Sequence, residues 1–206
     1  MRVNNASPMR CTLTTRTSAI LLSLLLAACS REHRIRKIVL VPIGPVPANV
    51  LANLERDLPP LLQREVTIGQ PIPRASAAFD RKRQQYRGSA LLQELERYDV
   101  VGVDRVVGII DADAYAPGLN FIFGQANKPG RVAVVALPRL RDSFRGRPDD
   151  PVRFRERVLK VTVHELGHAF GFAHCADRTC VMHFANSLRE ADQTGSHYCT
   201  SERLPK

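Results

Sequence analysis

Three features are missing from the sequence, and each absence excludes a class of protein. The longest apolar run, residues 19–29, is about half of the roughly 20 residues that a helix needs to cross a bilayer, so a transmembrane helix is the weaker interpretation. No internal repeat is present, which argues against a solenoid or other repeat array. Neither a nucleic-acid-binding motif nor aromatic interleaving accompanies the basic residues.

Positive charge is in excess along the chain. The net charge is +10, and much of the excess lies between Arg131 and Arg157. A basic stretch can recruit acidic peptides, anionic lipid head groups or nucleic acid, but more commonly it is a solvated loop and helix face. We therefore expect a solvated surface here, and no nucleic-acid partner.

The N-terminal segment has the pattern of an export signal. Arg2, Arg10 and Arg16 precede the apolar run, and no acidic residue interrupts them. The run ends in Leu26-Ala27-Ala28-Cys29, which resembles the bacterial lipobox, where cleavage precedes a cysteine that receives lipid. The alternative is an ordinary cleaved signal without lipid.

The lipobox resemblance predicts the organisation of the chain. Residues 1–28 are expected to be a lipoprotein signal peptide, residues 29–34 a tether, and residues 35–206 one folded domain. Several acyl chains on Cys29 would hold the protein stably on a membrane, whereas one chain binds only marginally. Ser30 in place of an aspartate favours, by analogy, the outer membrane of the cell envelope, facing the periplasm.

Apolar periodicity predicts alternating strands and helices after residue 34. Strands are expected where apolar and β-branched residues run together, at 35–43, 65–68, 106–110 and 132–137. Helices are expected at 47–62, ended or kinked by Pro59-Pro60, at 75–98, and from Pro151 or Val152 into a histidine-rich segment. The later half of the 75–98 helix, at Leu91, Leu92 and Leu95, is expected to pack on the sheet. Residues 141–151 predict a loop.

Residues 164–174, which read HELGHAFGFAH, carry the chemistry of the sequence. Residues four apart on an α-helix lie on one face about 6 Å apart, so His164 and His168 can chelate one ion. Glu165 lies about 100° from His164 around the helix, beside the ligand face. That position suits a general base rather than a ligand.

His174 can join the other two histidines only if the helix ends first. On a continuous helix it would lie roughly 9 Å beyond His168, outside the reach of Zn–N bonds of about 2.1 Å. Gly171 can adopt the left-handed conformation that ends helices and lets His174 turn back as the third ligand. Three histidine ligands leave the fourth position of a zinc ion open, which is typical of a catalytic zinc.

The extended pattern H-E-x-x-H-x-x-G-x-x-H resembles that of the metzincin metallopeptidases. In metzincins a methionine turn forms a floor beneath the metal, and the resemblance gives that role to Met182. Cys175 directly after the third histidine, with Cys180 and Tyr198-Cys199 downstream, is similar to the archaemetzincin family. The resemblance implies a zinc metallopeptidase, either an endopeptidase or an aminopeptidase, that acts on peptides or proteins.

The resemblance also implies an α+β fold for residues 35–206, the expected catalytic domain. It is a metzincin-like single domain in which a mixed sheet packs on helices, the active-site helix lies at the base of the cleft, and a short C-terminal subdomain follows. Residues 120–126 resemble the family's edge strand above the cleft, where an extended substrate can pair with free backbone groups. A plain core hairpin is the alternative for that stretch.

The family carries a second, structural zinc on four cysteines, and this sequence departs from it at one position. Glu202 stands where the fourth cysteine is expected, and only three thiols remain. Glu202, His197 or His183 could complete a tetrahedral zinc site. In an oxidising compartment, two of the cysteines could instead form a disulfide and leave one free. The three thiols are those of Cys175, Cys180 and Cys199.

The resulting hypothesis is a zinc peptidase in which Glu165 deprotonates the attacking water and later protonates the leaving amine. Tyr198 or His183 could assist at the oxyanion. The alternative is an envelope lipoprotein that holds zinc or binds a partner without cleaving peptides. Glu165 argues against that alternative, because a pure binding site has no need of this carboxylate.

Overall fold

The computed structural model describes residues 36–185, 187–199 and 204, all within one compact unit, Ile35–Lys206. The predicted signal peptide, the tether with Cys29, and Glu202 lie outside the described residues. Within the described part of the chain, none of the helices combines the length and apolar character that spanning a bilayer requires.

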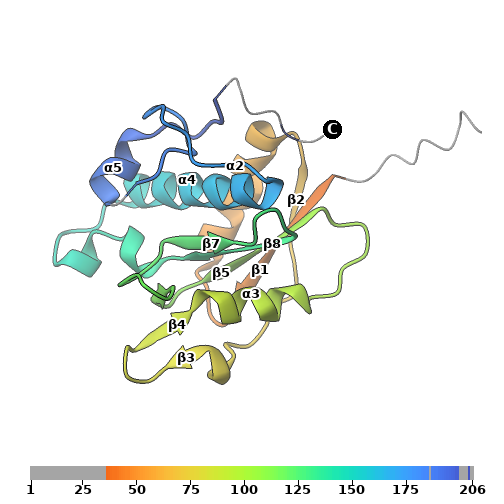
Figure 1. Cartoon of the computed structure of the whole chain (residues 1–206), viewed down its shortest axis with the longest axis vertical. Helices are drawn as coiled ribbons and strands as arrows, with labels where there is room; N and C mark the ends of the chain where they lie inside the picture. The colour runs from red at the N-terminus through yellow and green to blue at the C-terminus, as the bar shows by residue number, and fades with distance from the viewer. Residues whose placement is uncertain (1–35, 186, 200–203, 205–206) are drawn as a thin grey trace, which may run out of the picture. The chain divides into compact units, whose positions relative to one another are not determined.

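A five-stranded mixed sheet forms the centre of the fold (Figure 1). Four strands are mutually parallel, and β7 pairs antiparallel with β8 at one edge. The predicted strands are confirmed, except that the one expected at 120–126 is limited to its last three residues, at the sheet edge. In spatial order the strands are β2 (Glu65–Ile68), β1 (Lys37–Ile43), β5 (Arg105–Ile110), β8 (Val132–Ala136) and β7 (Gly124–Ala126).

Helices cover both faces of this sheet (Figure 1). Side chains alternate between faces along each strand, so Ile38 and Leu40 of β1 pack toward α2 and α4, and Val39 and Val41 pack toward α3. Two hydrophobic cores result, one on each face, which confirms the expected α+β architecture. The covering helices are α2 (Ala48–Leu62), α3 (Gly88–Glu96) and α4 (Pro151–Phe170).

Helix α2 continues through Pro59 and Pro60, so these prolines do not end it. Proline removes a backbone donor and costs a helix interior about 3 kcal/mol. Leu58 and Leu62 are fully buried on either side of the pair, and this burial offsets the loss. The helix ends at Gln63, which takes a left-handed conformation and donates its N–H to the carbonyl of Pro59.

The helix predicted over 75–98 is wrong in its first half. That half forms a 3-10 turn, Ser76–Ala78, and two short strands, β3 (Phe79–Asp80) and β4 (Gln85–Arg87). The Asp80 carboxylate accepts from the N–H groups of Lys82 and Arg83, and Gln84 adopts a φ of 57°, which together make a tight turn. Strand β4 also pairs with β6 (Ala114–Tyr115), giving a second, three-stranded sheet that the sequence did not predict.

The second half of that segment is helical, as predicted. Helix α3 buries Leu91, Leu92 and Leu95 against the central sheet. Its contact with β5 depends on Gly108, because a Cβ there would lie 2.7 Å from a Leu95 methyl.

Helix α4 begins and ends where the sequence predicts. Asp150 caps it by accepting from the N–H groups of Val152 and Arg153, and Pro151 occupies its first position. The preceding segment contains two 3-10 turns, Pro138–Leu140 and Ser143–Arg145. A short helix, α5 (Leu188–Gln193), follows in the described residues after α4.

Arg157 of α4 connects this helix to α5 and to the segment before α4. Its guanidinium is almost fully buried and donates two hydrogen bonds to the Asp192 carboxylate, at 2.6 and 2.7 Å. It also donates to the Leu140 carbonyl and forms an ion pair with Asp142. Burial raises the pKa of Asp192, but the hydrogen bonds and charge of Arg157 outweigh it and hold that pKa below its ordinary value.

Replacing Asp192 with Asn is expected to lower the free energy of unfolding by about 2 kcal/mol at neutral pH, because Arg157 loses its main partner. The folded-state pKa of Asp192 lies below the unfolded one, so its contribution is present above about pH 4 and is lost as the pH falls through the folded value. Denaturant titrations from neutral to acidic pH should therefore show that the free energy of unfolding falls less steeply with pH in Asp192→Asn than in the wild type. Equal stability to the wild type, or to the exposed control Asp99→Asn, would contradict this role.

Candidate active site

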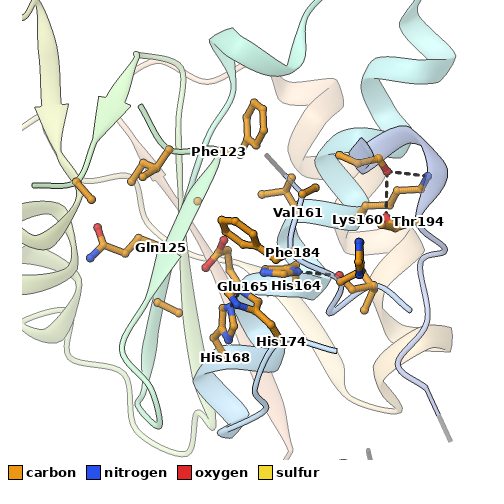
Figure 2. A pocket seen from close by; sticks show the side chains of 18 of the residues that line it. Phe123, Gln125, Lys160, Val161, His164, Glu165, His168, His174, Phe184 and Thr194 are labelled. Atoms are coloured by element: carbon orange, nitrogen blue, oxygen red, sulfur yellow. Dashed lines mark hydrogen bonds between the residues drawn. The ribbon is translucent and has the colours of Figure 1, made fainter. Parts of the chain in front are cut away.

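Three histidines converge at the C-terminal end of α4. His164 and His168 lie one helical turn apart, and His174 turns back toward them, as Figure 2 shows. The Nε2 atoms of His168 and His174 are 3.1 Å apart, and a metal-binding nitrogen of each of the three rings lies within 4.8 Å of the others. The predicted trio is therefore assembled in space.

The turn that brings His174 back depends on Gly171. Its φ of 101° lies in the left-handed region, where a side chain would be strained. The N–H of Gly171 bonds to the His168 carbonyl, and the N–H of Phe172 bonds to the Gly167 carbonyl, each at 2.9 Å. These bonds satisfy carbonyls that the helix end would leave unpaired.

Backbone carbonyls fix the orientation of two of the rings. The Nδ1 atoms of His164 and His168 lie 2.7 and 3.0 Å from the carbonyl oxygens of Val181 and Phe172. A carbonyl can only accept, so each Nδ1–H donates and each Nε2 keeps its lone pair for a metal. Burial lowers the pKa of His164 to about 4, and also lowers those of His168 and His174. All three rings are thus held in the neutral form that binds metals.

The donor set fits a zinc ion. Two nitrogen ligands on a tetrahedral zinc with bonds of about 2.1 Å lie about 3.4 Å apart, close to the spacing of His168 and His174. Three neutral imidazoles complete three positions. The fourth side faces a cleft of about 490 Å³ that the histidines help to line.

Glu165 points into the same cleft beside His164 (Figure 2). Its residue is only 7% exposed, and burial raises the pKa of its carboxyl group to about 8. Gly124 of the edge strand β7 leaves room for this carboxylate, because a Cβ there would lie 2.5 Å from Glu165 Cγ. Sequence reasoning missed Gly124, whose only signal was a glycine in an apolar strand, a sign of close approach.

Met182 lies fully buried against the inner side of α4. A Cβ on Gly167 would collide with its sulfur, so this glycine lets the methionine pack directly against the helix that carries His164 and His168. The floor role of Met182 stays a prediction. Of the two suggested oxyanion helpers, His183 lines the cleft, whereas the Tyr198 hydroxyl donates to the Val163 carbonyl and does not line it.

Comparison with known proteins gives the family. Peptidase family M54 matches residues 48–203. The chain belongs to this family. The archaemetzincin of Pyrococcus abyssi is 40% identical over 169 residues, which cover 79% of this chain and 89% of that protein.

Solved structures agree with this assignment. The crystal structure of archaemetzincin from Methanopyrus kandleri superposes with a TM-score of 0.73 at 38% identity, covering 84% of this chain and 93% of that one. The archaemetzincin of Archaeoglobus fulgidus, in complex with malonate, gives a TM-score of 0.70 at 30% identity and covers 80% and 96% of the two chains. As a member of peptidase family M54, the chain is a zinc metallopeptidase with a mixed α+β fold, and the non-cleaving alternative is not favoured.

This family member also gathers its three remaining thiols. The sulfurs of Cys175, Cys180 and Cys199 lie within 4.8 Å of one another, and those of Cys175 and Cys199 are 3.4 Å apart. No disulfide joins any two of these three cysteines, so the disulfide alternative is not formed. Among the described residues neither His183 nor His197 joins the group at that distance, and the third candidate ligand, Glu202, lies outside those residues.

Proposed function

We propose that His164, His168 and His174 hold the catalytic zinc of this peptidase and that Glu165 is its general base. The observation that carries the proposal is a buried carboxylate beside three converging Nε2 atoms, on the one side of the site that opens to a cleft. A zinc ion held by these residues would supply polarisation of the substrate carbonyl and would lower the pKa of a water to about 7.

Glu165 performs the proton transfers. Its carboxylate accepts a proton from the attacking water and then delivers it to the nitrogen of the leaving amine. Burial suits the group to both steps, because a raised pKa makes the carboxylate a stronger base toward water and lets the carboxyl group keep the proton until it is delivered to the amine. The close approach of Gly124 leaves the carboxylate room at the cleft, and no hydrogen bond or ion pair within the described part of the chain draws it away.

The substrate is a peptide, and β7 offers it a backbone edge. β7 is the last strand of the central sheet on this side and lines the cleft together with Glu165. An extended peptide laid along it can pair with its free N–H and C=O groups. Met182 contributes by packing beneath the histidines rather than by touching the peptide.

Glu165→Gln should abolish peptide hydrolysis, with a fall in kcat of at least about a hundredfold, while zinc content stays unchanged. Turnover of a fluorogenic peptide and metal analysis on the same preparation check both parts. Glu156→Gln makes the same change on an exposed part of α4 and should leave turnover intact. Full activity of Glu165→Gln would overturn the assignment.

The thiol cluster is the basis of a second proposal, a structural zinc held by Cys175, Cys180 and Cys199. Two sulfurs on a tetrahedral zinc with bonds of about 2.3 Å lie about 3.8 Å apart, near the 3.4 Å between Cys175 and Cys199. Burial raises the pKa of the Cys180 thiol to about 12, so a metal would be needed to keep its thiolate form. Glu202, in the position of the missing cysteine, is the proposed fourth ligand.

Metal analysis of the pure protein should give two zinc ions per chain, falling to one on Cys175→Ser. His168→Ala serves as the matched control, since it should remove the other ion and leave the thiol site loaded. One zinc per chain, with none lost on Cys175→Ser, would rule out the structural zinc.

Attachment to the membrane through Cys29 is a third proposal, and it rests on the arginine-flanked apolar run and the lipobox-like segment alone. It locates the peptidase in the bacterial cell envelope, on the outer membrane facing the periplasm. Mass spectrometry of the mature N-terminus should find Cys29 as the first residue, carrying acyl chains. A mature chain that begins elsewhere, or an unmodified Cys29, would contradict the proposal.

A further inference from the structure

Lys160 lies on the same face of α4 as the histidines, one turn before His164. The three residues Lys160, His164 and His168 follow each other at intervals of four and form a half-exposed stripe, whereas residues 161–163 between the first two are buried. All three line the cleft. Figure 2 shows Lys160 and Thr194 together, on the far side of His164 from Gln125.

Lys160 shares the cleft with buried apolar residues. Val161, its neighbour on α4, lines the cleft, and so do Val181 and Ala191. Lys160 Nζ donates to two backbone carbonyls at the end of α5, those of Ala191 at 3.4 Å and Asp192 at 3.0 Å. An ammonium has three donors, so one donor is left over.

Among the described residues, Lys160 forms no ion pair. Its charge helps to lower the pKa of the neighbouring Asp192, but both oxygens of that carboxylate are bonded by Arg157. Apart from Glu165 and the histidines, Lys160 is the only charged side chain that lines the described cleft. The cleft is also lined by the apolar side chains of Leu119, Phe121 and Phe123.

We propose that Lys160 is a specificity residue that binds a carboxylate of the substrate at the residue next to the scissile bond. Side chains one helical turn apart are separated by about 5–6 Å, and an extended peptide advances about 3.3 Å per residue. In a peptide that runs along α4 and is held at His164, the neighbouring residue therefore covers about half of the distance, and its side chain spans the rest to Lys160. The methylene groups of a glutamate or aspartate then pack on Val161 and Ala191. This inference rests on the proposed function of the histidine site.

Binding to the inactive variant separates this subsite from catalysis. In the Glu165→Gln background no peptide is cleaved, so calorimetric titration reports affinity alone. The probes are two pairs of matched peptides. The first pair differs only at the residue next to the bond that the wild type cleaves, which is glutamate in one peptide and glutamine in the other. The second pair ends at that residue, with a free C-terminal carboxylate in one peptide and an amide in the other. The glutamate peptide is expected to bind about tenfold more tightly than the glutamine peptide.

Adding Lys160→Met should remove this preference and leave the affinity for the glutamine peptide within about twofold. Lys160→Arg should retain it, because it preserves the charge. Lys128→Met is the matched control: it removes an exposed positive charge close enough to lower the pKa of His168 and His174, but it does not line the cleft. Lys128→Met should change the affinities for the glutamate and the glutamine peptide by the same factor.

Each outcome decides the proposal. A preference for the free chain end over the amidated one, lost on Lys160→Met, assigns the carboxylate to the peptide terminus instead of the side chain. Equal loss for the glutamate and glutamine peptides on Lys160→Met would overturn the inference, because a lysine that only holds the end of α5 would affect both alike. If wild type cleaves nothing, matched random peptides in the same titration still test the carboxylate preference, and only the proposed function fails.

Discussion

The site depends on the end of one helix. His164 and His168 are placed by the regular turn of α4, but His174 reaches them only because the helix stops at Gly171, whose φ of 101° a side chain would strain. The bonds that close this turn also bring the Phe172 carbonyl to His168, so the same few residues supply the third ring and orient the second. A single backbone conformation thus links the sequence pattern to the geometry of the site.

The segment after that turn, residues 174–183, contributes one histidine to the site and orients another. It supplies His174, the Val181 carbonyl that orients His164, and Met182, which packs against Gly167. The N–H of Cys175 bonds back to the Met182 carbonyl and closes the segment on itself. Two of the three clustered thiols lie in the same stretch, so a metal held there would stiffen the loop that carries the third histidine.

Short-range sequence signals made much of the fold and of the histidine site predictable. The Asp150 cap, Pro151 at the first helical position, the histidine spacing and the glycine at the end are all short-range features, and α4 has the predicted bounds. The long apolar strands were equally plain, since burial on both faces demands continuous apolar runs. The 75–98 stretch failed because its first half is polar, and pairing of β4 with the distant strand β6 decides its shape.

Contacts between residues far apart in the sequence could not be predicted from local patterns. Glycine is needed at position 124 only because β7 packs against Glu165. The hydrogen bonds of Lys160 form only because α5 packs beside α4.

The most direct test of the whole account is anomalous diffraction at the zinc edge from crystals of the purified protein. An anomalous-difference peak should lie about 2.1 Å from the Nε2 atoms of His164, His168 and His174. Absence of that peak in zinc-replete protein, or rings turned away from one another, would contradict it.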